Sequence, residues 1–523
     1  MAAEFAEGAE AAPIVPSKPI ALAAWAALAI LGLCGLAFVR GGHVQSDEGW
    51  YLTAAREVFE GRLPYRDFMY TQGPLHPYVY GLAQRLSGSG LLAARATSWA
   101  FFLAAVALAA LVARRFGGHL AALLALALIG SAPMTFWVWM LPLTHASAGF
   151  FLVLGIYLLT HPSNDVRREA GGLLALALGS AIRVSLVGAL ACAVVWIGWR
   201  RRSRAALAVA ASFALALLVL LVGPFAFASP ENFRFAVWGY HALRTQEFSP
   251  SPMPVSAVAW WQGKGRFLLE LARNFSVLVL AGLIAILIAR RRLAVHGGSD
   301  RGAPRGLAFI AAVVIVTASI SMIPHPVHVT YAGILVPPAS VLCGVALAGA
   351  LAGPRSRWAT RVAWALVGCL AIAAWAYARG LDPSELARVR QAAVAIDRAL
   401  PPGPILTFHN TITAENGRRL LPGLEMGPFA FWPHMADEDA ARRRVVNTAK
   451  LCGMLESREA VAVIVTKLES GLSRLPCRGE PFGSVLAREY VEVPSLRVPG
   501  YGQYGAPKDG GDVLYVFQRR PAR

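Results

Sequence analysis

The chain has 523 residues, of which 56% are hydrophobic and only 15% are charged. This composition excludes an ordinary soluble globular protein and indicates a chain whose main solvent is lipid. The net charge of +19 does not indicate nucleic-acid binding, because the basic residues stand in short clusters between apolar segments, where they act as topology signals.

Apolar runs long enough to cross a bilayer, or nearly so, recur along residues 1–379. The first is read as an uncleaved span, since no small-residue cleavage site follows it. We predict a polytopic α-helical membrane domain over 1–379 with about eleven transmembrane helices. The runs lie at 20–39, 96–113, 118–134, 145–160, 170–185, 187–199, 205–228, 269–289, 307–323, 331–352 and 359–378.

The pair between Gly171 and Trp199 is either a tight hairpin or one long helix, and the second reading would reverse every later segment. Charge bias favours the hairpin, because tight arginine clusters gather on the cytoplasmic side of membrane proteins. With the N-terminus inside, that side receives "ARRFGG", "DVRRE", "WRRRSR", "ARRRLAVHGGSDRGAPR" and "PRSRWATR". The exterior side then holds a first loop over 40–95, the segment from Ser229 to about Arg266, the "PHPVH" turn and everything after Arg379. The sequence therefore predicts a multi-pass protein of the plasma (inner) membrane.

Residues 380–523 differ from the rest and predict a small extracytoplasmic α/β domain. The segments "GPILTF", "AVAVIVT" and "DVLYVFQRR" are typical of strands, and "DPSELARVRQAAVAIDRAL" and "DEDAARRRVVNTAKLCGML" of amphipathic helices. Cys452 and Cys477 both fall in this domain, and whether they are bridged stays open.

The first exterior loop contains the stretch "VQSDEGWYLTAAREVFEGRLPYRDFMYTQGPLHPYVYG". Ser46 suits an N-cap, with Asp47 and Glu48 in the first helical turn. The apolar face of this helix predicts that it lies flat in the membrane interface; its residues are Tyr51, Ala54, Ala55, Val58 and Phe59. A capped surface helix explains these features, and so does a general base held where a lipid-borne substrate meets a watery acceptor.

Three features of the loop carry a resemblance to a known family. They are the acidic pair after the first span, the continuation "A-R-x-x-x-x-G-x-x-P-Y", and the proline-centred "YTQGPLHPY". Together they resemble the first exterior loop of GT-C membrane glycosyltransferases, above all the family 39 protein mannosyltransferases and their bacterial relatives, including the aminoarabinose transferases. The late segment "PHPVHVTYAGILVPPASVL" and "ILTFHNTITAENGRRLLPGLEMGPF" near the C-terminus extend the resemblance over most of the chain.

The resemblance implies inverting transfer of a sugar from a polyprenyl-phosphate donor to a cell-envelope acceptor (glycan, lipid or protein) on the outer face, without a nucleotide. It carries Asp47 over as the catalytic base, with Glu48 as its acidic neighbour. Many relatives have "DKPPL" where this chain has Thr71–Leu75, so a phosphate-binding lysine is missing. We expect the donor phosphate to be bound by residues among Arg66, Gln72, Arg183, Arg244, His325, His328 and Tyr331.

Other readings stand beside these assignments. Arg183 either binds the lipid phosphate or snorkels to the interface, and the two histidines of "PHPVH" are turn residues, weak metal ligands or phosphate donors. Asp67 either pairs locally with Arg66 or supports the acidic pair. His76 and His241 are expected at the acceptor or the membrane interface.

Two rival functions would suit a polytopic chain: a transporter or lipid-linked sugar flippase, and a scaffold that uses its exterior domain. Transporters show paired half-structures, and no repeat relates the two halves of this sequence. No Walker loop, GxGxxG motif or closed zinc spacing occurs, so no cofactor is indicated, although metal dependence stays open.

The predicted orientation is tested by reporter fusions placed after Arg379. Alkaline phosphatase fused there should be active, because it folds only outside the cytoplasm, and a cytoplasmic reporter at the same junction should be inactive. The opposite pattern would mean that the number of spans before Arg379 is even.

Overall fold

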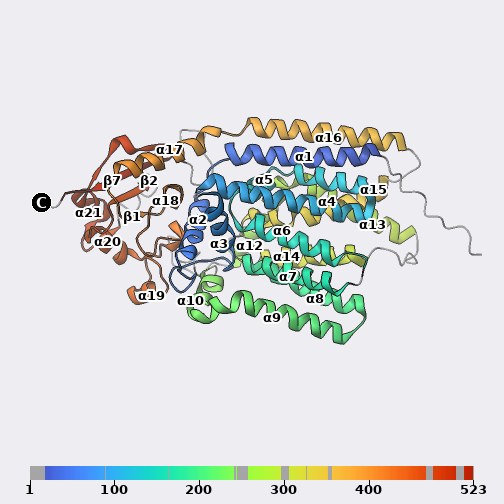
Figure 1. The fold of residues 1–523 in the computed structure, drawn as a ribbon, viewed down its shortest axis with the longest axis horizontal. Coiled ribbons are helices and arrows are strands. Elements are labelled where there is room, and N and C mark those ends of the chain that lie inside the picture. The colour runs from blue at the N-terminus through green and yellow to red at the C-terminus, as the bar shows by residue number, and fades with distance from the viewer. Residues whose placement is uncertain are drawn as a thin grey trace, which may run out of the picture.

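A bundle of long helices carries a smaller sheet-containing region at one end (Figure 1). The structure is a computed structural model, and it describes residues 18–88, 90–163, 165–240, 243, 257–295, 305–324, 327–351, 356–466, 475–501 and 512–521. Within these ranges the first part of the chain is helical, and every described strand lies after residue 400.

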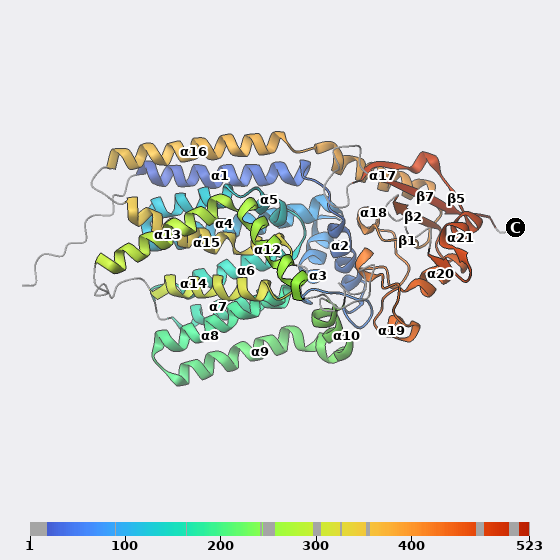
Figure 2. The ribbon, with the colours of Figure 1, turned by 180° about the vertical axis from the view of Figure 1, so that it is seen from behind.

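The long helices of the bundle run along its length, while α2 and α3 lie across the end nearest the sheet (Figures 1 and 2). The helices up to the middle of the chain are α1 (Lys18–Gly41), α2 (Ser46–Phe59), α3 (His76–Ser87), α4 (Leu91–Gly130), α5 (Pro133–Met140), α6 (Thr144–Leu159), α7 (Val166–Ile182), η1 (Val184–Leu186), α8 (Val187–Arg201), α9 (Arg204–Ala228), α10 (Pro230–Arg234) and η2 (Phe235–Gly239). The later ones are α12 (Ala257–Asn274), α13 (Ser276–Val295), α14 (Arg305–Ser321), η3 (Val329–Leu335), α15 (Val336–Leu351) and α16 (Ser356–Arg379).

Among the described residues, 6 helices are long and apolar enough to cross a membrane, or up to 8 if each of two bent helix pairs is one span. The pairs are α5 with α6, bent by 99°, and α12 with α13, bent by 93°. The protein is thus a polytopic helical membrane protein, and the count of eleven spans stays a prediction. α4 covers two of the predicted runs, and Gly117 and Gly118 leave helical geometry between them, with φ at Gly118 of 71°.

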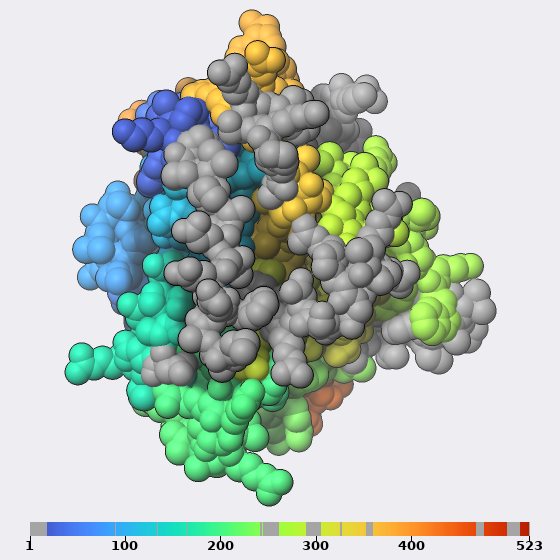
Figure 3. Space-filling model, turned by 90° about the vertical axis from the view of Figure 1, so that its right-hand side faces the viewer, coloured from blue at the N-terminus to red at the C-terminus, as the bar shows by residue number. Residues whose placement is uncertain are grey.

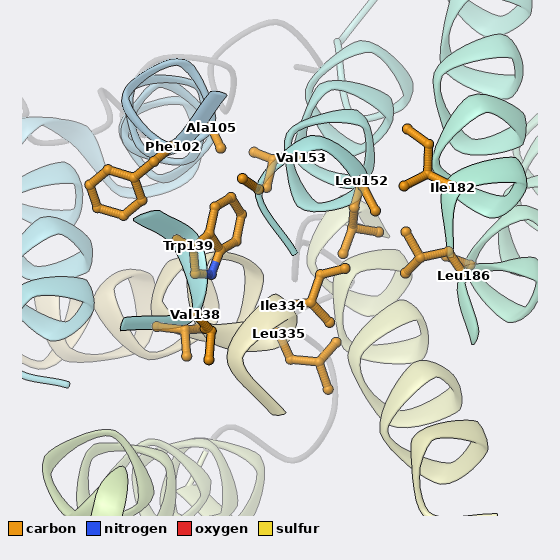
Figure 4. Close-up of a cluster of buried hydrophobic side chains, with 14 of the residues drawn as sticks. Phe102, Ala105, Val138, Trp139, Leu152, Val153, Ile182, Leu186, Ile334 and Leu335 are labelled. Carbon is orange, nitrogen blue, oxygen red and sulfur yellow. The ribbon is translucent and has the colours of Figure 1, made fainter. Parts of the chain in front are cut away.

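The core of the bundle is built around Trp139 of α5 (Figure 4). Its indole is fully buried, and Nε1 donates to the carbonyl oxygen of Gly333 at 2.9 Å. Gly149 of α6 has to be a glycine here, because a Cβ would lie 2.2 Å from the Trp139 ring. Side chains from α4, α6, α7, η1 and η3 complete the cluster, which locks the short α5 between the spans.

The turn between α6 and α7 and the turn between α8 and α9 lie at the end of the bundle away from the sheet (Figures 1 and 3). Arg115 donates to the carbonyl oxygen of Tyr157 at 2.9 Å, and Arg200 donates to that of Leu159 at 3.1 Å. Arg201 pairs with Glu169 at 2.9 Å. The clusters "ARRFGG", "DVRRE" and "WRRRSR" therefore share one end, as the charge pattern predicted. The other two predicted clusters lie partly outside the described residues, and the orientation of this end across the membrane stays a prediction.

A mixed five-stranded sheet forms the centre of the C-terminal region, with the strand order β1-β2-β7-β5 and β6 also paired to β7. β1 and β2 are parallel, with Ile405 opposite Ala462, and the other pairings are antiparallel. The strands are β1 (Ile405–Thr407), β2 (Ala462–Thr466), β3 (Pro476–Cys477), β4 (Glu480–Pro481), β5 (Tyr490–Glu492), β6 (Val498–Tyr501) and β7 (Asp512–Arg519), of which β3 and β4 form a separate pair. The three predicted strands are confirmed.

Short helices surround this sheet: α17 (Pro383–Ala399), α18 (Asn410–Asn416), η4 (Gly427–Ala430), α19 (Asp437–Arg442), α20 (Thr448–Glu456), α21 (Phe482–Glu489) and η6 (Pro494–Leu496). The single helix predicted for "DEDAARRRVVNTAKLCGML" is wrong, since α19 and α20 are separated by a bridge between Val446 and Phe431. Asn447 caps α20 by accepting from the backbone N–H of Lys450. Cys452 of α20 and Cys477 of β3 form a disulfide.

The C-terminal region and the loop over residues 40–95 share one hydrophobic core. Val44, Leu52 and Tyr80 from the loop pack in the same cluster as Leu386 and Ile412. The face of α2 that was predicted to lie in the membrane interface is instead mostly inside the protein, with Tyr51, Ala54, Ala55 and Val58 all buried. α2 therefore lies between the bundle and the sheet region and contacts both. The domain boundary after residue 379 stays a prediction.

The backbones of α2 and α18 approach each other closely at Gly49, and this contact predicts a steric test. A Cβ on Gly49 would lie 2.1 Å from the backbone nitrogen of Thr411, so one of the two helices would have to move. Gly49→Ala should therefore lower the stability by about 1–3 kcal/mol, measured by thermal melting in detergent.

Gly453 of α20 is the matched control, because a Cβ there meets nothing within 4 Å. Gly453→Ala should be neutral or stabilising by up to about 1 kcal/mol, through helix propensity. Equal melting temperatures for the two variants would contradict the close packing of α2 on α18.

Candidate functional site

Asp47 stands in the first turn of α2, where the helix begins one residue earlier than predicted. Gln45 is the N-cap in place of Ser46, and it forms a capping box with Glu48. Asp47 is half-buried, and its Oδ1 accepts from Nε1 of Trp50 at 3.1 Å. The carboxylate is thus held by its own helix at the bundle end of the first loop.

Glu48 lies in a different environment, although it is the next residue. Its side chain is fully buried, and it forms a two-pronged ion pair with the equally buried Arg95 of α4, with N···O distances of 2.7 and 2.6 Å. Oε1 also accepts from the backbone N–H of Gln45 at 3.0 Å. Arg95 in turn donates to the carbonyl oxygens of Gly42 and His43, each at 2.8 Å. Glu48 is therefore bound into the turn between α1 and α2, and its expected supporting role beside Asp47 stays a prediction.

A polar cluster lies next to Asp47 inside the bundle. Tyr51 is buried one turn further along α2, and burial, together with the Asp47 carboxylate, holds the pKa of its hydroxyl above the usual value. Arg183, at the end of α7, lies beside Tyr51 and donates from Nη1 to Oγ1 of Thr144 at 2.8 Å. Its guanidinium stacks over the ring of Tyr331 at 5.3 Å. Arg183 is only 9% exposed, and its Nε has no hydrogen-bond partner among the described residues. This cluster joins one carboxylate to one deeply buried cation.

The segment "TQGPL" is bound to the chain immediately before Arg183. The backbone N–H of Gly73 donates to the carbonyl oxygen of Ile182 at 3.2 Å, and that of Leu75 donates to Ala181 at 3.1 Å. A Cβ on Gly73 would lie 2.2 Å from the Ala181 oxygen, so a glycine is required. Gln72, which is half-buried, is therefore next to the residue that contacts the end of α7. The part of the loop that lacks the lysine of relatives lies against the segment that supplies Arg183.

His76 and His145 lie on the bundle side of this cluster. His76 is fully buried between Tyr51 and Tyr80, with ring centroids 4.6 Å from each, and Nδ1 is 3.2 Å from the Tyr70 hydroxyl. Burial lowers the pKa of His76 to about 3, so this imidazole is neutral. Its expected role at the acceptor or the membrane interface stays a prediction.

His145, at the start of α6, is a residue that the sequence reasoning missed. It is 5% exposed and lies near Arg183, His76 and the backbone of Thr330. An ionisable side chain inside an apolar run is itself a signal of function, and that signal was present in "LTHASAG". Lys264 of α12 was also missed: it is 4% exposed, and Nζ donates to the carbonyl oxygens of Met322 and, at 2.7 Å, Pro324.

The remaining predicted residues lie apart from the cluster or at its edge. Arg66 pairs with Asp67 at 2.8 Å, and this hydrogen-bonded partner lowers the pKa of the Asp67 carboxyl. This local pair is one of the two alternatives predicted for Asp67. Arg444 lies next to it and donates to the carbonyl oxygen of Arg66 at 3.1 Å. His328 contacts Tyr331, with ring centroids 5.6 Å apart, at the edge of the cluster. The predicted residues Arg244, His241 and His325 lie outside the described residues.

A cavity of about 290 Å³ lies between α2, α3 and α18, on another face of α2 from Asp47. It is lined by Leu52, Ala55, Arg56, Phe59, Glu60, Gly81, Gln84, Arg85, Ala414 and Gly417, none of which was a predicted site residue. Over the described ranges, no three His, Cys, Asp or Glu side chains come together in a way that could hold a metal ion.

Comparison with known proteins relates this geometry to a fold. No protein-family model and no curated protein sequence matches the chain. Its structure is similar to crystal structures of ArnT from Cupriavidus metallidurans, bound to undecaprenyl phosphate and in the apo state, with TM-scores of 0.58 and 0.59, 14% identity, and coverage of 95% of this chain and 97% of ArnT. The oligosaccharyltransferase of Archaeoglobus fulgidus, tethered with an acceptor peptide, is similar at a TM-score of 0.50 and 13% identity, over 93% of this chain and 75% of that one. The chain has the GT-C membrane glycosyltransferase fold, which confirms the resemblance seen in the first loop.

The different environments of the two acidic residues predict different effects on stability. Glu48→Gln leaves the Arg95 charge buried without a counter-charge, which typically costs about 3–5 kcal/mol, whereas Asp47→Asn keeps a hydrogen-bond acceptor for Trp50. In thermal melting, Glu48→Gln should therefore melt well below Asp47→Asn. Pairing Glu48→Gln with Arg95→Met should recover part of the loss; if the double variant melts below Glu48→Gln, charge compensation is not the role of Glu48.

Proposed function

We propose that this protein is a membrane glycosyltransferase that moves a sugar from a polyprenyl-phosphate donor to an extracytoplasmic acceptor, with inversion. The observation that carries the proposal is the cluster in which Asp47 and Arg183 both flank Tyr51 at the mouth of an apolar bundle. The fold supports it, because ArnT, whose crystal structure contains undecaprenyl phosphate, has the same architecture over nearly its whole length.

The proposed chemistry needs little covalent work from the protein. Asp47 takes the proton of the acceptor hydroxyl as that oxygen attacks the anomeric carbon, and the bond from this carbon to the phosphate oxygen breaks. Arg183 stabilises the negative charge that develops on the departing phosphate, and its unpaired Nε provides a donor for it. Thr144 and the ring of Tyr331 hold the guanidinium in place.

Inversion follows from the number of available carboxylates. A retaining mechanism needs a second carboxylate as nucleophile, about 5–5.5 Å from the first. Glu48 is the sequence neighbour of Asp47, but both of its oxygens are engaged by Arg95 inside the protein. One carboxylate on the acceptor side and a cation on the donor side suit a single in-line displacement.

The rival function is transport or flipping of a lipid-linked sugar. Its specific support is the two bent helix pairs, because transporters use broken helices at their binding sites. A flippase moves the lipid without breaking the sugar–phosphate bond, so consumption of the donor separates the two functions.

The test offers a panel of radiolabelled polyprenyl-phosphate sugars to the protein in nanodiscs, with a cell-envelope fraction as acceptor. The wild type should release polyprenyl phosphate. Asp47→Asn should lower turnover by about 10²–10⁴-fold while leaving donor binding largely intact, because the amide cannot accept the proton. Arg183→Leu should act differently and weaken the apparent affinity for the donor.

Asp439 of α19 serves as the matched control, since it is an exposed aspartate of the exterior region that pairs only locally with Arg442. Asp439→Asn should transfer sugar at the wild-type rate. Near-wild-type turnover by Asp47→Asn in a folded preparation would remove Asp47 from the mechanism, and an intact donor after prolonged incubation with the wild type would favour the flippase.

A further inference from the structure

Arg62 lies between two buried carboxylates that come from distant parts of the chain. Glu57 belongs to α2 and Glu425 to the segment before η4, and their side chains are only 5% and 3% exposed. Nη2 of Arg62 donates to Oε1 of Glu425 at 2.9 Å, and Nη1 donates to Oε2 of Glu57. One guanidinium thus compensates two carboxylates and joins the first exterior loop to the C-terminal region.

Each carboxylate is otherwise built into its own segment. The second oxygen of Glu425 accepts from the backbone N–H of Gly423 at 2.8 Å. Its carbonyl oxygen accepts from Nδ2 of Asn410 at 2.7 Å. Arg62 also donates to the carbonyl oxygen of Asp67 at 2.9 Å, which closes the loop that follows α2. The guanidinium therefore links the loop that follows α2 to the segment around Glu425.

The ion pairs of Arg62 offset a repulsion between the two carboxylates. Two carboxylates buried side by side repel each other, and burial raises the pKa of Glu57 while Arg62 opposes that rise. Arg56, on the same helix as Glu57, is 3.8 Å from the other oxygen of that carboxylate, but among the described residues only Arg62 bridges Glu57 and Glu425. Without Arg62 the contact would hold two buried carboxylates with no cation between them, which is unfavourable, whereas a contact without any of the three charges would not be. The electrostatic part of the interaction between the loop and the segment around Glu425 thus depends on Arg62.

The segment that follows Glu425 runs back along α2 to the proposed base. Four residues on, the ring of Phe429 meets Trp50 edge to face, with centroids 5.8 Å apart. Trp50 in turn donates to Asp47. A chain of contacts therefore leads from Arg62 through Glu425, Phe429 and Trp50 to the Asp47 carboxylate, over one face of α2.

We infer that Arg62 is a positioning residue, which holds the segment from Glu425 to Ala430 against α2 and so fixes Trp50 and, through it, Asp47. The C-terminal region then contributes to the active centre, because its contacts with α2 hold that helix in position. The structural part of this inference stands on the contacts alone, and its consequence for turnover rests on the proposed function.

The test measures hydrogen–deuterium exchange in the full-length protein in nanodiscs. In Arg62→Met, which keeps the length of the side chain, peptides covering α2 and residues 421–430 should exchange about tenfold faster or more, because the two carboxylates push the segments apart. The triple variant Arg62→Met/Glu57→Gln/Glu425→Gln removes both carboxylates together with the cation between them and should regain most of the protection.

Arg488→Met is the matched control. Arg488 also lies between two glutamates, Glu480 and Glu489, but this arginine is half exposed and its loss leaves the carboxylates in water. It should leave the exchange of α2 unchanged. If Arg62→Met fails to fold, Glu425→Gln is used instead, and it should speed exchange at residues 421–430 while Glu57 keeps its partner.

Wild-type exchange in Arg62→Met would overturn the inference, and so would a triple variant as unprotected as Arg62→Met, because charge would then not be what holds the contact. In the transfer assay Arg62→Met should lower kcat about tenfold or more with the KM for the donor kept, and the triple variant should recover kcat. A wild-type protein without transferase activity would refute the proposed function, while the exchange data would still decide whether Arg62 joins the two segments.

Discussion

The rest of the site depends on the buried ion pair between Arg95 and Glu48. A charged pair removed from water is tolerated only if the remaining donors and acceptors are also satisfied, and here the guanidinium uses the carbonyl oxygens of Gly42 and His43 while the carboxylate caps the start of α2. This arrangement ties the end of the first span, the beginning of α2 and the beginning of α4 to one point. The position of Asp47, the next residue to Glu48, follows from it.

The two carboxylates of the acidic pair consequently have separate tasks. Successive residues of a helix point about 100° apart, so Glu48 can face the interior of the turn while Asp47 faces the polar cluster. The cluster itself is costly, since Arg183 is buried in an apolar bundle and its Nε has no hydrogen-bond partner among the residues that the structure describes. A buried polar group without a partner needs a physical explanation, and the proposed donor phosphate would supply one.

The C-terminal region contributes more than a cover over the bundle. Its hydrophobic core includes side chains of the first exterior loop, and Gly49 allows the backbone of α18 to approach α2 closely. Glu385 accepts from the backbone N–H of Val44 at 3.1 Å, and Glu415 accepts from that of Leu91 at 2.8 Å. Buried glutamates of the C-terminal region thus cap the chain at both ends of the loop, and Glu425 binds its middle through Arg62. A loop held at so many points is suited to keep one carboxylate in a fixed place.

The sequence by itself determined the apolar runs of the bundle, the sheet-forming segments after residue 400 and the acidic motif after the first span, because each is a local pattern of hydrophobicity or residue type. It also identified Arg183 as an unusual charge in an apolar setting. Only the tertiary structure decided which charges meet. Glu48 pairs with Arg95, Arg66 pairs with Asp67, and His145 and Lys264 are buried inside the protein. It also placed the apolar face of α2 inside the protein, where the sequence predicted the membrane interface. Ion pairs join residues tens to hundreds of positions apart, and hydrophobic periodicity is the same for a face that packs on lipid and one that packs on protein, so neither choice can be made without the fold.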